Sequence, residues 1–88
     1  MKKIKLSGRE VSVLRAIDFT LGTSGADVME RTQMDIDDLV DIINALMEVG
    51  YIEVTPPAER VSQDSLKEAM LEVNPSFVHD LRDAIIHR

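Results

Sequence analysis

The spacing of apolar residues changes at Gly50, and this change limits the chain to folds that combine helix and sheet. Before the glycine, the stretch DIDDLVDIINALMEV repeats apolar residues every three or four positions, which is typical of an amphipathic helix. After it, YIEVT alternates apolar and polar residues, as a half-buried strand does. We therefore predict a helix over 35–49, capped by Asp35, and a strand over 51–55. The fold class that follows is α+β, mostly α.

Two more helices are predicted before this one. Ser7 and Glu10 have the spacing of a capping box, which places the start of a helix at residue 8. Apolar residues at helical spacing, ending with Leu21 before Gly22, extend it over 8–21. A short helix over 26–32 follows, with Thr23 or Ser24 as its cap.

The last third of the chain is predicted to hold a second strand and a final helix. AMLEV alternates over 69–73, and Asn74 followed by Pro75 is typical of a helix start, here a helix over 75–87. Between the strands, PPAERVSQDSLKE has the prolines and polar residues of a long loop. A chain of 88 residues has material for one hydrophobic core, so residues 1–88 are expected to form one domain.

The stretch ADVMERTQMDIDDLVDIINALMEVGYIE resembles the common pattern of winged helix-turn-helix proteins, of the small prokaryotic regulator type. Val28 and Met29 match the second helix of that pattern, Met34 matches the apolar residue of the turn, and EVGYIE matches the entry into the wing. The resemblance implies a three-helix core, a two-stranded wing and a C-terminal helix. It also implies that the third helix reads DNA in the major groove while the wing touches the backbone. A homodimer through residues 75–88 is a further implication.

The charge of the third helix disagrees with that role. Between Asp27 and Glu53 the chain has eight acidic residues and one basic residue, a net charge of −7, whereas the rest of the chain sums to +1. A helical projection buries Ile36, Leu39, Val40, Ile43, Leu46 and Met47. The opposite face, which a partner would meet, consists of Asp37, Asp38, Asp41, Asn44, Ala45 and Glu48. Such a face supplies no cation to phosphates and is repelled by them.

Two functional hypotheses follow. In the first, the chain is a non-catalytic regulatory module that recognises a protein with a basic surface through the acidic third helix, with Ile42 at the edge of the contact. In the alternative, it is a DNA-binding transcription regulator whose wing uses Arg60 and Lys67. Exposed apolar residues at Ile42, Val49 or Ile86 would suit a protein partner, or they thicken the core.

A third interpretation of the acids is purely structural. Asp35, Asp37 and Asp38 lie in the first turn of the predicted helix, where acids interact with the helix dipole by roughly 0.3–1 kcal/mol each. This explanation does not extend to Glu48 near the other end. In this structural interpretation, the acidic face is a solvated surface without a partner.

Catalysis and metal binding find little support in the sequence. There is no cysteine, no phosphate-binding glycine loop and no nucleophile-elbow pattern, so we expect no enzyme activity and no cofactor. His79, Asp83 and His87 recur every four residues, but the outer pair would lie roughly 12 Å apart along a helix, too far for one metal ion. The N-terminal stretch lacks the apolar run of a signal peptide, which favours a cytoplasmic location without a membrane partner.

Overall fold

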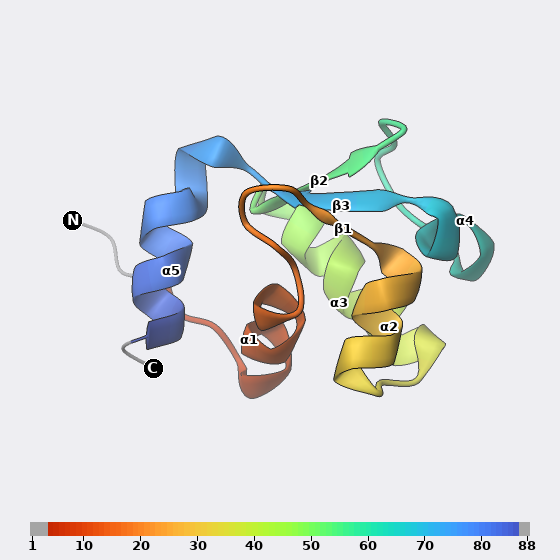
Figure 1. The fold of residues 1–88 in the computed structure, drawn as a ribbon, viewed down its shortest axis with the longest axis horizontal. Helices are drawn as coiled ribbons and strands as arrows, with labels where there is room; N and C mark the ends of the chain where they lie inside the picture. Colours follow the sequence, from red (N-terminus) through yellow and green to blue (C-terminus); the bar gives the residue numbers. More distant parts are fainter. Residues whose placement is uncertain (1–3, 87–88) are drawn as a thin grey trace.

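The structure, a computed structural model, describes residues 4–86, and within this range three helices cover one face of a small antiparallel sheet (Figure 1). These helices are α1 (Gly8–Arg15), α2 (Gly25–Thr32) and α3 (Ile36–Glu48). The strands are β1 (Thr23–Ser24), β2 (Ile52–Thr55) and β3 (Met70–Val73), in the order β1-β3-β2. Two further helices, α4 (Gln63–Glu68) and α5 (Val78–Ile86), lie at opposite ends of the molecule (Figure 1). The predicted α+β class is confirmed.

The core forms where the apolar sides of these elements meet. From α3 it takes Leu39, Ile43 and Leu46, which are fully buried, as the helical spacing predicts. The sheet contributes alternate residues, because successive strand residues point to opposite faces. Thus Ile52 and Val54 are buried, while the intervening Glu53 is exposed.

The two predicted strands pair as expected, and a third, unpredicted strand joins them. Ile52 lies opposite Val73 and Glu53 opposite Glu72, so β2 and β3 form an antiparallel pair in register. Strand β1 pairs with the other edge of β3, Thr23 opposite Leu71. The sheet has three strands within the described range, where the sequence predicted two. A strand of two residues is too short for alternation to reveal it.

Helix α1 ends earlier than predicted, and Leu21 is not in the core. The helix stops at Arg15, and Leu21 is 78% exposed instead of buried. The cause is Asp18, whose carboxylate accepts hydrogen bonds from the backbone N–H groups of Thr20 at 2.8 Å and Leu21 at 2.9 Å. Aspartate side chains compete in this way with helical hydrogen bonds and close turns instead. The capping box at the other end of the helix, Ser7 with Glu10, is confirmed.

The predicted long loop over 56–68 is wrong in its second half, which folds into α4. Ser62 caps this helix, and its hydroxyl accepts a hydrogen bond from the N–H of Ser65 at 3.1 Å. Val61 and Leu66 are buried, so the segment is fixed to the core at two points. Because only these two apolar residues of a polar stretch contact the core, the sequence shows no apolar periodicity that would indicate a helix here.

Asn74 is the N-cap of the C-terminal helical segment, as predicted. Its side chain accepts a hydrogen bond from the N–H of Ser76 at 3.0 Å and donates one to the Gly50 carbonyl at 2.8 Å. Residues Pro75–Phe77 form a 3-10 turn, and α5 continues to Ile86; residue 87 lies outside the described range. Among the described residues, no helix has both the length and the apolar character needed to cross a bilayer.

Candidate functional site

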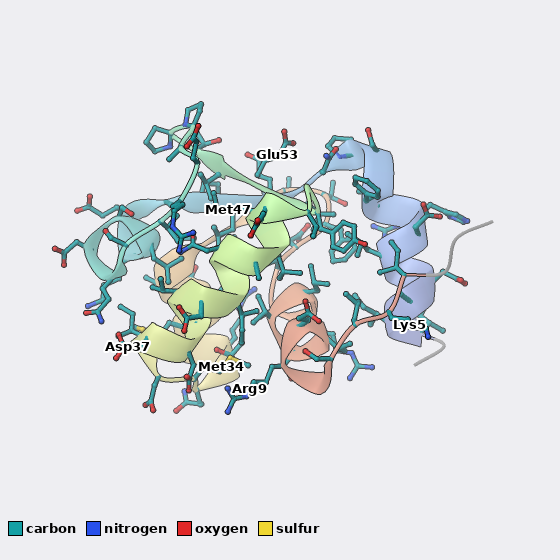
Figure 2. The ribbon with its side chains drawn as sticks, turned by 180° about the vertical axis from the view of Figure 1, so that it is seen from behind. Lys5, Arg9, Met34, Asp37, Met47 and Glu53 are labelled. Carbon is teal, nitrogen blue, oxygen red and sulfur yellow. The ribbon has the colours of Figure 1, made fainter. Side chains whose placement is uncertain are left out.

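The solvent-facing side of α3 is the candidate site. Its exposed residues are Asp37, Asp41, Ala45 and Glu48, which we call the α3 acidic face. The packing of Leu39, Ile43 and Leu46 into the core holds this side of the helix outward. Figure 2 views the molecule with α3 in front, with Asp37 at its first turn and Met47 near its far end.

Two acids at the start of α3 interact with neighbouring helices. The Asp37 carboxylate accepts a hydrogen bond from the side-chain amide of Gln63 on α4. Asp38 is half-buried and lies 3.9 Å from the guanidinium of Arg9 on α1. Both side chains of this ion pair retain much solvent contact, and such pairs contribute roughly 0–1 kcal/mol. These two acids therefore help to tie α3 to its neighbours.

Asp35 occupies the N-cap position, as predicted, but its side chain makes no capping hydrogen bond. Its contribution to the helix start comes from its backbone, whose carbonyl accepts from the N–H of Leu39 at 3.0 Å. The predicted capping role of its carboxylate is wrong.

Asn44 was predicted on the partner-facing side, and this prediction is wrong because the residue is buried. Asn44 as a whole is 6% exposed. The amide Nδ2 donates to the Val61 carbonyl at 3.0 Å, and Oδ1 accepts from the Val61 N–H at 2.8 Å. The helical projection placed Asn44 beside the acids correctly, but the segment before α4 covers this side of the helix. Asn44 is a structural residue.

The apolar candidates separate into core and surface residues. Ile42 is half-buried and packs against the core, so the structure favours the core interpretation for it. Val49 is 57% exposed at the end of α3, and Ile86 is 73% exposed at the end of α5. These two residues lie on different elements and do not extend the α3 acidic face.

The predicted wing cations lie between β2 and β3. Arg60 precedes α4 and Lys67 belongs to it, and both are exposed. The exposed acids Glu59, Asp64 and Glu68 lie in the same segment. The surface of this segment therefore has no excess of positive charge.

Of the histidine and aspartate series considered for metal binding, the structure describes only His79 and Asp83. Both are exposed on α5, and His87 lies outside the described residues. Over residues 4–86, no three histidine, aspartate or glutamate side chains gather closely enough to hold a metal ion.

The structure adds one residue to the surroundings of the candidate site that the sequence did not indicate. Gln63 contacts Asp37 across 26 positions of sequence, through a helix that was predicted as loop. No local pattern signals such a contact.

Comparison of the chain with known protein families, with curated proteins and with solved structures found no match.

Proposed function

We propose that the chain is a non-catalytic regulatory module of the winged-helix type that binds a protein with a basic surface through the α3 acidic face. The order of elements supports the winged-helix assignment. Helices α2 and α3 are joined by a short turn, and an antiparallel β2–β3 hairpin and a C-terminal helix follow. This is the order that the sequence resemblance implies.

The proposal rests on the exposure of Asp41 and Glu48 and on the absence, within residues 4–86, of a cation beside them. Both are exposed, and among the described residues neither forms an ion pair. Glu48 lies in the last turn of α3, where the helix dipole disfavours an acid. Helix stability therefore does not explain Glu48, whereas a basic partner does.

The same charges argue against the alternative, a DNA-binding regulator. Binding to duplex DNA depends on cations that displace counterions from phosphates. The α3 acidic face contributes no cation, and Arg60 and Lys67 are offset by three acids in their own segment.

Titration against mixed-sequence duplex DNA at low and at raised salt separates the two functions. We expect no sub-micromolar binding at either salt concentration, because the outer side of α3 repels phosphate. Salt-sensitive, sub-micromolar binding at low salt would overturn the protein-recognition proposal.

A second experiment measures binding of a basic probe, a helical lysine–alanine peptide, to the α3 acidic face. NMR shift changes should centre on Asp41, Ala45 and Glu48. The double variant Asp41→Asn/Glu48→Gln should bind the peptide more weakly than wild type. The matched control Glu30→Gln/Asp80→Asn removes the same number of charges from exposed positions on α2 and α5, and should retain most of the binding.

A further inference from the structure

A groove of about 360 Å³ lies between α5 and the chain segment that leaves α1. It is at the end of the molecule opposite α4 (Figure 1). Its lining is mainly apolar and comes from both sides. The segment that includes the end of α1 contributes Leu14, Ile17 and Phe19, and α5 contributes Ile85 and Ile86.

The local fold keeps this groove open. Helix α1 ends at Arg15 because Asp18 closes a turn with the backbone that follows it, so the chain leaves the helical path beside α5. On the other side, Leu81 is fully buried and fixes α5 to the core, whereas Ile86, five residues later, is 73% exposed. The end of α5 therefore presents apolar surface to solvent at the groove.

The charge of the groove differs in sign from that of the chain. Arg15 and Arg82 are exposed and line the groove from its two sides. The one carboxylate in the lining, Asp18, accepts two hydrogen bonds from the backbone of its own turn. Two cations and one carboxylate leave the lining with a net charge of +1, in a chain of net charge −6.

Arg82 is oriented by an aromatic ring. Its guanidinium carbon lies 5.5 Å from the centroid of the Phe19 ring. A guanidinium in such a contact keeps its N–H donors in its own plane, where they match a planar carboxylate. Within the part of the chain that the structure describes, neither Arg15 nor Arg82 forms an ion pair with a carboxylate. A carboxylate from outside the chain would supply this acceptor.

The size of the groove favours a small ligand over a segment of a protein. Ligand pockets span roughly 300–1,000 Å³, and this groove is close to the lower limit. Such pockets combine apolar walls with a few polar groups that orient the ligand. The single excess positive charge matches a ligand that carries one negative charge.

We propose that this groove binds a small monocarboxylic acid with an apolar body. The carboxylate contacts Arg15 and Arg82, and the apolar body packs against Phe19, Ile85 and Ile86. None of the residues that line the groove belongs to α3, so the site is separate from the α3 acidic face and does not depend on the proposed function.

Titration of the full chain with phenylacetate, followed by NMR, tests the site. Shift changes should centre on residues 14–20 and 82–86. The dissociation constant should lie in the millimolar range, because a ligand of this size makes few contacts. Shift changes that are absent, or that are spread evenly over the surface, would overturn the inference.

A pair of variants tests the part of the two arginines. Arg15→Gln/Arg82→Gln should bind phenylacetate roughly three- to tenfold more weakly, as expected for the loss of two exposed ion pairs. The matched control Arg60→Gln/Lys67→Gln removes the same charge from exposed positions before and within α4, and should bind like wild type. Equal weakening in both double variants would contradict the proposal, because the ligand would then respond only to overall charge.

Two further ligands separate the charged and apolar contributions. Phenylacetamide keeps the shape of phenylacetate without its charge, and acetate keeps the charge without the ring. Both should bind more weakly than phenylacetate. If phenylacetamide binds equally well, the arginines have no part in binding, and if acetate does, the apolar lining has none. Either result would refute the site as proposed.

A second copy of the chain is the rival occupant of this apolar surface. Dilution of the ligand-free protein tests it, because the shifts of residues 82–86 should not depend on protein concentration. Concentration-dependent shifts at these residues, without an effect of phenylacetate, would show an interface between copies and overturn the ligand site. The proposed function has separate readouts, which are DNA binding and shift changes on the α3 acidic face.

Discussion

The side chain of Asn44 holds one end of the segment between β2 and α4, because both of its polar groups bond to the backbone of Val61. These bonds are buried, so water cannot replace them if the amide is removed. A buried backbone group without a partner costs about 1–3 kcal/mol.

We predict that Asn44→Ala lowers the free energy of unfolding by about 1–3 kcal/mol, since it leaves the Val61 N–H and C=O unpaired. Urea denaturation measures this change, and hydrogen exchange should show earlier opening at residue 61. Ala45→Ser, one position along at an exposed site, should change stability by less than about 0.5 kcal/mol. Equal effects of the two substitutions would show that the amide is not a structural link.

A second single residue, Asp18, stabilises the fold through its ionised carboxylate. The backbone N–H of Leu21, and next that of Thr20, hold the pKa of the Asp18 carboxyl below its usual value of 3.8. Unfolding breaks these bonds, so the unfolded chain binds a proton at higher pH than the folded chain does. The carboxylate therefore adds stability above the unfolded pKa, and this contribution is lost as the pH falls through the lower, folded pKa.

We predict that wild type is more stable than Asp18→Asn at neutral pH and that the difference shrinks as the pH falls below about 4. Urea denaturation at a series of pH values measures this trend. Asp41→Asn serves as the control, because Asp41 accepts no such backbone hydrogen bond and should show a smaller dependence. A constant difference between wild type and Asp18→Asn over the whole pH range would contradict the assignment.

At the scale of elements, α2 and α4 approach each other closely at Gly25. A Cβ atom on Gly25 would lie 1.8 Å from the carbonyl oxygen of Leu66, a backbone atom that cannot move without displacing α4. The N–H of Gly25 also donates to the Ala69 carbonyl at 2.9 Å, which ties the start of α2 to the residue after α4. Glycine is required here for space.

Gly25→Ala should therefore destabilise the fold by about 1–3 kcal/mol or more, as overpacking does, despite the better helix propensity of alanine. Thermal unfolding measures the loss, and trypsin cleavage after Arg60 and Lys67 should become faster as α4 detaches. The neighbouring substitution Ala26→Ser, at an exposed position, should leave both measurements nearly unchanged. Normal stability in Gly25→Ala would mean that α4 is not packed on α2.

At the scale of the whole molecule, the sequence predicted those elements in which the periodic pattern of apolar residues extends over enough positions to be recognised. Helix α3, with thirteen residues, and the alternating strands β2 and β3 belong to this class. The caps at Ser7 and Asn74 were also predicted, from their residue types and from the residues that follow them. Helix α4 and strand β1 were missed because each depends on contacts between distant segments. Leu66, for example, is buried only because α4 packs against α2 and α3.

The candidate site was predictable only in part, for the same reason. Helical projection identified Asp37, Asp41, Ala45 and Glu48 as exposed, since that depends on α3 alone. It misplaced Asn44, whose burial depends on the segment that ends at Val61.

The contact between Gly25 and Leu66 also has a consequence for finding relatives of this chain. Surface acids can change without changing the fold, whereas a chain that keeps α4 in this position needs a residue without a side chain at the start of its second helix. It also needs an amide on the third helix that can bond the backbone of a residue 17 positions later. A search for distant relatives should therefore weight this glycine and this asparagine above the acidic residues of α3.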